Sequence, residues 1–307
     1  MNITEIKQKI ENGAFDKDFA MLYGDVSAAR ARYTAACDSF CDIFSERDNI
    51  RLFSAPGRTE VGGNHTDHQH GCVLAGGVNL DVIAVVAPNN DGKVRIKSEG
   101  YDMDTVDICK LEKDESEHGC ASALIRGVLS RFKELGCTLS GFNAYTTSNV
   151  LKGSGLSSSA AFEVLVGNIV NGMFFEAKAD EITVAKIGQY AEREYFGKPC
   201  GLLDQMASSL GGFTYADFFD PAEPITEKIN LDIHSFGYTL CVVDTGGNHA
   251  NLTQDYADIT IECKKISNAL GVDFLRDADS ERFYNSISEL RRSCGARAVL
   301  RAFHFCN

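Results

Sequence analysis

A run of small residues, KGSGLSSSAAFEVLVG at 152–167, carries the most specific chemical signal in the chain. Its glycines and serines lie between a strand-like segment and an apolar helix. Backbone N–H groups there can approach an anion at the positive N-terminal end of the helix. The run lacks the Gly-Lys-Ser/Thr ending of a P-loop, and taken alone it also fits a serine-rich helix cap. The sequence therefore predicts a polyphosphate-binding loop, with a plain cap as the alternative.

A second polar segment, SAPGRTEVGGNHTDHQHG at 54–71, connects two apolar strands. Its Arg58, His65 and Asp67 are the kind of polar groups that bind hydroxyls or a phosphate when they line a pocket. His65, His68 and His70 also invite a metal interpretation, but such a run in a turn-rich loop is more often solvated than ligating. We therefore expect this segment to bind a small molecule.

The third segment, AEREYFGKPCGLLDQMASSLGG at 191–212, places Asp204 among Leu202, Leu203 and Met206. An apolar environment raises the pKa of a carboxyl group unless a cation pairs with it. An aspartate just before a run of small helical residues is also a common N-cap. Asp204 is therefore predicted to be either a helix cap or a catalytic carboxylate.

The apolar spacing predicts that helices and strands position these segments. Two or three helices are expected within residues 3–46, and β-rich structure follows from Ile50. A turn at 89–92 indicates a hairpin after the strand 72–88. Further helices are expected at 119–136, from Ala160, at 180–196 and from about Asp255, and further strands at 141–149, 213–219, 228–232 and 238–245. A weak domain boundary lies near 211–224, where glycines and prolines cluster.

The composition is that of an ordinary globular protein, with 307 residues, 44% of them hydrophobic and 24% charged. A net charge of −13 disfavours nucleic acids and anionic membranes as partners. The apolar run from Val82 to Ala87 is too short to span a bilayer, and the N-terminus lacks the apolar core of a signal peptide. Eleven cysteines without a C-x-x-C pair indicate reduced, mostly buried thiols, and we expect a cytoplasmic protein.

The three segments resemble, in the same order, motifs of the GHMP family of small-molecule kinases and, within it, of the galactokinases. GRTEVGGNHTDHQHG at 57–71 resembles the sugar signature GRVNLIGEHTDYNGG, and CGLLDQ at 200–205 resembles CGIMDQ. GLSSSAA at 155–161 resembles the phosphate-binding second motif. The nucleotide-binding positions implied are Gly153, Ser154, Gly155, Leu156, Ser157, Ser158, Ser159 and Ala160.

The resemblance also implies roles for single residues. Asp204 would face the anomeric hydroxyl of a sugar, and Arg58 would pair with it beside the transferring phosphate. Ser159 and Glu192 match the ligands of Mg²⁺. The implied sugar-binding positions are Arg58, Asn64, His65, Asp67, Gly201, Asp204 and Tyr256, the last within a stretch at 244–266 that is similar to the family's.

Two departures from the family pattern affect what can be expected. Asn64 stands where the family has Glu, and residues 68–70 replace Tyr-Asn-Gly, so a uronic acid is a rival substrate. The family's glycine-rich third motif does not occur in these 307 residues. The chain ends instead in a family-like helix with Phe303 and Phe305 on an expected buried face. We therefore expect an incomplete C-terminal domain.

The resemblance implies an α+β, two-domain architecture, with an N-terminal domain at 1–212 and a partial C-terminal domain at 213–307. The expected activity is ATP- and Mg²⁺-dependent phosphorylation of the anomeric hydroxyl of D-galactose to galactose 1-phosphate. The alternatives are a kinase for a related sugar such as galacturonate, and a sugar-binding remnant or sensor without turnover. No obligate protein partner is expected.

Overall fold

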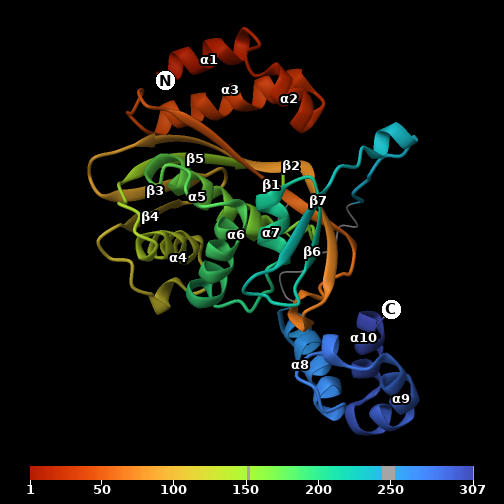
Figure 1. Ribbon diagram of the computed structural model, residues 1–307. Coiled ribbons are helices and arrows are strands. Elements are labelled where there is room, and N and C mark those ends of the chain that lie inside the picture. The colour runs from red at the N-terminus through yellow and green to blue at the C-terminus, as the bar shows by residue number, and fades with distance from the viewer. Residues whose placement is uncertain (151–152, 244–252, 307) are drawn as a thin grey trace.

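A seven-stranded mixed sheet lies at the centre of the molecule (Figure 1). Its order is β4-β3-β5-β2-β6-β7, with β1 paired to β2. The computed structural model describes residues 1–150, 153–243 and 253–306, apart from the side chains of His234, Thr253, Gln254 and Tyr256. The strands are β1 (Arg51–Gly62), β2 (Cys72–Pro88), β3 (Lys93–Ser98), β4 (Met103–Asp107), β5 (Phe142–Ser148), β6 (Phe213–Asp217) and β7 (Ile225–Ile229).

Helices cover both faces of the sheet because β2 is apolar on both sides. Its residues Ile83, Val85 and Ala87 pack against the N-terminal helices, whereas the alternating Val82, Ala84 and Val86 pack against the opposite layer. The first layer comprises α1 (Ile3–Glu11), α2 (Asp16–Tyr23) and α3 (Val26–Ile43), and the opposite layer comprises α4 (Ala121–Glu134), α5 (Ser158–Phe174), α6 (Glu181–Tyr190) and α7 (Leu203–Leu210). This mixed α/β architecture agrees with the expected class.

Most of the expected elements are present, but the hairpin after β2 is wrong. The turn at 89–92 leads into β3, yet β3 pairs with β4 and with β5, and β5 lies between β3 and β2. The turn residues were recognisable, whereas the insertion of β5 depends on a parallel pairing with a strand more than 40 residues further along. A local turn signal carries no information on that pairing.

The strand expected at 238–245 does not form in the part that the structure describes. Residues 238–243 have no regular structure and are exposed, and residues 244–245 lie outside the described ranges. The strand expected at 228–232 is displaced to β7 at Ile225–Ile229, where it pairs with β6. β-branched composition predicts a strand only where a neighbour supplies the hydrogen bonds.

A separate cluster of helices follows the sheet. It contains α8 (Thr253–Ala269), α9 (Ser280–Cys294), α10 (Ala296–Cys306) and the 3₁₀ turn η5 (Leu275–Asp277). These helices pack around their own core, which includes Ile266, Phe283 and Val299. Figure 1 shows this cluster at the lower end of the molecule, beyond the sheet. Strands β6 and β7 continue the sheet past residue 212.

The cysteine side chains differ in part from the expectation. All eleven cysteines are free. The expectation that most of them are buried is wrong, since only Cys37, Cys137 and Cys263 are buried.

Within the described ranges, no helix combines the length and the apolar character that crossing a membrane requires.

Candidate functional site

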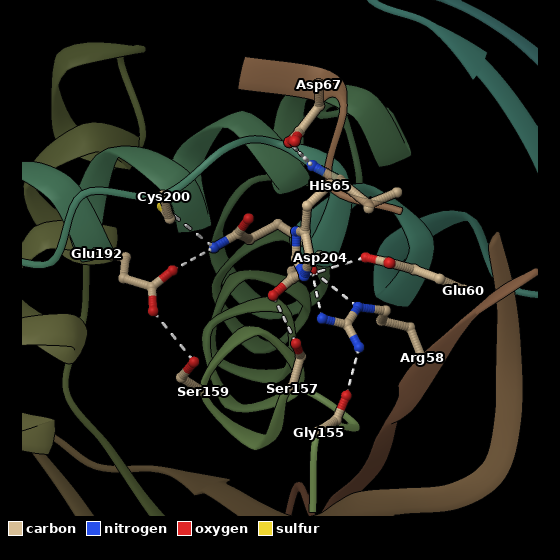
Figure 2. A network of polar contacts seen from close by, with 12 residues as sticks. Arg58, Glu60, His65, Asp67, Gly155, Ser157, Ser159, Glu192, Cys200 and Asp204 are labelled. Atoms are coloured by element: carbon tan, nitrogen blue, oxygen red, sulfur yellow. Dashed lines mark hydrogen bonds and ion pairs between the residues drawn. The ribbon is translucent and has the colours of Figure 1, made fainter. Parts of the chain in front are cut away.

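Arg58 is the centre of a polar cluster that joins three separate parts of the chain (Figure 2). It lies on β1, and its side chain is 7% exposed. Its Nε donates to Oδ1 of Asp204 on α7 at 2.8 Å, and its second guanidinium nitrogen lies 2.7 Å from the same oxygen. The third nitrogen donates to the carbonyl oxygen of Gly155 at 2.6 Å. The pairing of Arg58 with Asp204, expected from the motifs, is present.

The Asp204 carboxylate is held in its ionised form by its neighbours. Burial alone raises the pKa of this carboxyl, but the charges of Arg58 and His65 and a hydrogen bond from Ser157 lower it below its usual value. Ser157 Oγ donates to Oδ2 of Asp204 at 2.5 Å. Asp204 is the second residue of α7, and the N-cap position is Leu202. The interpretation of Asp204 as a plain helix cap is therefore wrong.

The residues 153–160, here called the serine loop, place the N-terminus of α5 beside this cluster. Gly153 and Gly155 have φ values of 78° and 79°, and Ser157 at the N-cap has a φ of 55°. Ser157 makes no side-chain cap hydrogen bond, and its hydroxyl donates to Asp204. The first-turn N–H groups of a 17-residue apolar helix therefore have no side-chain acceptor from the cap residue. This geometry suits an anion.

The serine loop is fixed to β1 by close backbone contacts. Arg58 N donates to the carbonyl oxygen of Leu156 at 3.1 Å. A side chain at Gly57 would place its Cβ 3.0 Å from that same oxygen. Glycine at this position therefore lets the strand and the loop approach each other closely.

A second polar cluster lies at the first turn of α5. Ser159 Oγ donates to Oε1 of Glu192 at 3.1 Å, so the two residues expected as metal ligands are adjacent. Glu192 comes from the π-helical turn η3 (Ala191–Phe196) and is 1% exposed. Lys198 Nζ lies 2.7 Å from the same Glu192 oxygen. A hydroxyl, a carboxylate and phosphate oxygens together fit the oxygen ligands that Mg²⁺ accepts.

Two buried residues that the sequence did not single out orient Glu192. Gln205 Nε2 donates to Oε2 of Glu192 at 2.8 Å and to Oε2 of Glu163 at 2.9 Å. Glu163 is 0% exposed, and burial together with the nearby Glu192 raises its pKa well above the usual value. The neutral form of Glu163 is therefore favoured relative to that of an exposed glutamate, which limits the negative charge beside Glu192.

The residues 57–71, here called the signature loop, bring further polar groups to the same place. Asp67 Oδ2 accepts a hydrogen bond from the backbone N of Leu203 at 3.1 Å, which ties the loop to the start of α7. Gly201 lies against Asp67 so closely that a Cβ there would be 1.7 Å from Oδ2. His65 Nε2 lies 3.2 Å from Oε1 of Glu60. His65 and Asp67 thus lie near Asp204, as expected (Figure 2), and Gly201 lies against Asp67.

Of the expected sugar-binding positions, Asn64 does not join this cluster on the described contacts, and Tyr256 cannot be compared. Asn64 is exposed, and its carbonyl oxygen lies 3.1 Å from Nε2 of His304 on α10. Tyr256 lies in α8, and its side chain is outside the described residues.

The altered positions 69 and 70 face the helix cluster rather than Asp204. Gln69 is 2% exposed, and its Oε1 accepts a hydrogen bond from the backbone N of Leu275 at 3.2 Å. The His70 ring stacks on Phe274 with the ring centroids 3.6 Å apart. Arg276 donates to the carbonyl oxygen of His70. These two substitutions therefore dock the signature loop on the C-terminal helices.

The three histidines of the signature loop do not converge on one point. Among the described residues, Glu60, His65 and Asp204 each place one potential ligand atom within 4.8 Å of the others, and His68 and His70 are not in that group. Burial lowers the pKa of His68. Glu60 was not singled out from the sequence, although its position two residues after Arg58 on one strand places both on the same face.

The chain matches two family models. Residues 38–88 match the galactokinase galactose-binding signature, and residues 123–212 match the GHMP kinases N terminal domain. These ranges contain the signature loop, the serine loop, Glu192 and Asp204. Each motif that carried the resemblance before residue 213 therefore lies inside a matched range.

Curated relatives and a solved structure agree with these matches. The chain is 33% identical over 226 residues to galactokinase of Streptomyces coelicolor, covering 74% of this chain and 58% of the relative. It is 32% identical over 257 residues to galactokinase of Lactobacillus helveticus, covering 79% of this chain and 65% of the relative. The matched part thus spans about three-fifths of these relatives. The crystal structure of Lactococcus lactis galactokinase complexed with galactose superposes with a TM-score of 0.69 at 22% identity, covering 86% of this chain and 68% of that chain.

Proposed function

Since this chain belongs to the GHMP kinase family, we propose that it transfers the γ-phosphoryl group of ATP to the anomeric hydroxyl of D-galactose. The observation that carries the proposal is the contact of Arg58 with both Asp204 and the serine loop. One guanidinium thus lies between a carboxylate and a helix N-terminus suited to polyphosphate. The galactokinase galactose-binding signature, which matches residues 38–88, and the galactokinase relatives support galactose as the sugar.

The proposed roles follow from charge and geometry. Asp204 is ionised and accepts the hydrogen bond of the attacking hydroxyl, which orients that oxygen toward the phosphorus. Arg58 neutralises the charge that develops on the transferring group, and the N-terminus of α5 does the same for the remaining phosphates. Ser157 fixes the second oxygen of Asp204 and therefore its rotamer.

Ser159 and Glu192 are the residues that would hold Mg²⁺, which supplies charge neutralisation between the phosphates when bound. The fit is supported by the donor set and by the burial of Glu192 beside Gln205, which donates hydrogen bonds to both Glu192 and Glu163. Lys198 already contributes one positive charge at this point. With Mg²⁺ held by Ser159 and Glu192, this ammonium group would add to the neutralisation of the nearby phosphates.

Asp67, His65, Gly201 and Tyr256 remain the proposed sugar-binding residues. We also keep the division into two domains as a proposal, with the phosphate and sugar segments in the N-terminal one. The abundance of free thiols supports the cytoplasm as the compartment.

Mg²⁺-dependent release of ADP from ATP by the purified chain tests the proposal. Galactose is compared with galacturonate, glucose and a blank without sugar. Galactose-dependent ADP release is the expected result. Binding of galactose without ADP release would support a binding protein instead, and turnover on galacturonate alone would support the uronate kinase.

Asp204→Asn tests the assigned role. This variant keeps the shape of the side chain but loses the negative charge, and we expect turnover to fall at least 100-fold while galactose still binds. Full activity of the variant would contradict the role of Asp204. A thermal melt checks that the variant folds, because Arg58 loses its partner in it.

A further inference from the structure

Glu60 is a buried carboxylate beside Asp204 that the proposed roles leave unused. Its side chain is 10% exposed, and Oε1 lies 3.2 Å from Nε2 of His65. That oxygen has no hydrogen-bond partner other than this ion pair. No hydrogen bond or ion pair joins Oε2 to another described residue, so this oxygen can accept a hydrogen bond. Burying a carboxylate with unfilled acceptor sites costs stability, which points to a ligand that fills them.

The position of Glu60 directs it at the proposed sugar site. It follows Arg58 by two residues on β1, so both side chains lie on the face of the strand that is turned toward α7. The register of β1 with β2 shifts between Glu60 and Gly62, and such a bulge re-aims the neighbouring side chains. Figure 2 shows Glu60 pointing toward His65 and Asp204 from the side opposite Glu192. One ligand atom of Glu60, His65 and Asp204 each lies within 4.8 Å of the others.

The charges around this point favour a neutral ligand with hydroxyl donors. Glu60, Asp67 and Asp204 contribute three carboxylates against Arg58 and, when it is protonated, His65, and these two cations are already paired with Asp204 and Glu60. A sugar hydroxyl donates a hydrogen bond to a carboxylate, whereas a sugar acid adds a further negative charge to the same small volume. The exposed Asn64 cannot offset this added negative charge, because its side chain is uncharged.

Resting on the proposed sugar kinase function, we propose that Glu60 binds the sugar directly, through a hydrogen bond from one ring hydroxyl to Oε2. Oε1 holds the imidazole of His65 next to the same sugar. The three carboxylates together select a neutral hexose over the corresponding uronic acid. The carboxylate that Asn64 lacks is thus supplied from β1.

Direct binding of sugars to Glu60→Gln tests this without requiring turnover. The dissociation constants of galactose, galacturonate and the 2-, 3-, 4- and 6-deoxygalactoses are measured by calorimetry on both proteins. We expect Glu60→Gln to raise the dissociation constant of galactose at least tenfold. For the one deoxy sugar that lacks the contacted hydroxyl, the same substitution should raise the dissociation constant less than twofold. The ratio of galactose to galacturonate affinity should fall at least tenfold.

Two controls keep the result interpretable. Glu227→Gln changes the net charge equally at an exposed position of β7 and should leave every constant unchanged. Glu60→Asp replaces Glu60→Gln as the test if the latter fails to fold. It retains the charge but shortens the side chain by one methylene, so it should weaken galactose binding less, with the same dependence on the contacted hydroxyl.

Several outcomes would overturn the inference. An equal loss for all sugars would mean that Glu60 acts only by positioning His65, and no loss would mean that it has no role in binding. Loss of galactose binding on chelation of divalent ions, with no nucleotide present, would assign Glu60, His65 and Asp204 to a metal. If the unaltered chain binds galactose without releasing ADP, the kinase proposal fails, but the role of Glu60 in sugar binding is still tested. If the unaltered chain does not bind galactose, both the kinase proposal and the role of Glu60 are contradicted.

Discussion

Gly201→Ala should separate sugar binding from the integrity of the fold, because the added methyl group meets a single functional side chain. Its Cβ would lie 1.7 Å from Oδ2 of Asp67, 2.5 Å from Cγ and 2.8 Å from Oδ1. Relief of this overlap requires Asp67 or the backbone at Gly201 to move by more than about 1 Å, since carbon and oxygen atoms rarely approach closer than about 3 Å without bonding.

The magnitude follows from what Asp67 holds. Its carboxylate accepts the hydrogen bond of Leu203 N, and loss of a hydrogen bond to a charged group costs about 1.5–3 kcal/mol. Displacement of a sugar-binding group by about 1 Å costs up to roughly 100-fold in turnover. We therefore expect kcat/KM for galactose to fall by about 10- to 100-fold, while unfolding free energy falls by no more than about 3 kcal/mol.

The assay is galactose-dependent ADP release with a parallel urea melt. Gly62→Ala is the matched control, because a Cβ at Gly62 has no atom within 4 Å. The control should keep its kcat/KM within about twofold, since an added methyl in open space touches nothing. Unchanged kinetics in Gly201→Ala would refute the reasoning, as would an equal loss in the control.

Two further predictions concern other clusters. Since burial raises the pKa of Glu163, the folded chain keeps a proton there that the unfolded chain releases above about pH 4.3, so wild-type stability decreases as pH rises from that value. The stability of Glu163→Gln relative to wild type should therefore increase between pH 5 and 7, by up to about 1.4 kcal/mol per pH unit, and urea melts showing a constant difference would contradict this. Arg276→Ala removes two 3.0 Å hydrogen bonds to Asp217 and should destabilise the docking of η5 by about 1–2 kcal/mol. Faster amide hydrogen exchange at Leu275 would show this loss. The control Arg131→Ala breaks an exposed ion pair with Glu134 and should leave the exchange at Leu275 unchanged.

The sequence predicted the pairing of Arg58 with Asp204 and the adjacency of Ser159 and Glu192, because short motifs keep the backbone geometry of their loops. It also predicted most helices, since the apolar spacing is strong. Glu60 was not predicted to face Asp204, since its direction depends on a bulge in β1 and on the packing of α7.

Other features could not be predicted for a related reason. Glu163 lies in an apolar helix, and its raised pKa depends on its burial and on Glu192, which is distant in the sequence. The insertion of β5 between β2 and β3 likewise depends on long-range pairing. Gln69 and His70 were expected to change sugar recognition rather than packing, because their partners at 274–276 lie more than 200 residues away.

The stacking of His70 on Phe274 and the hydrogen bond from Leu275 N to Gln69 have an evolutionary consequence. Residues 69 and 70 and the segment 274–276 form one packing unit although they are distant in the chain. Substitution on one side leaves an unmatched ring or a buried amide without its acceptor on the other. Among homologues these positions should therefore covary, and a signature loop grafted alone into another kinase of the family should bring its sugar contacts without the support that orders them.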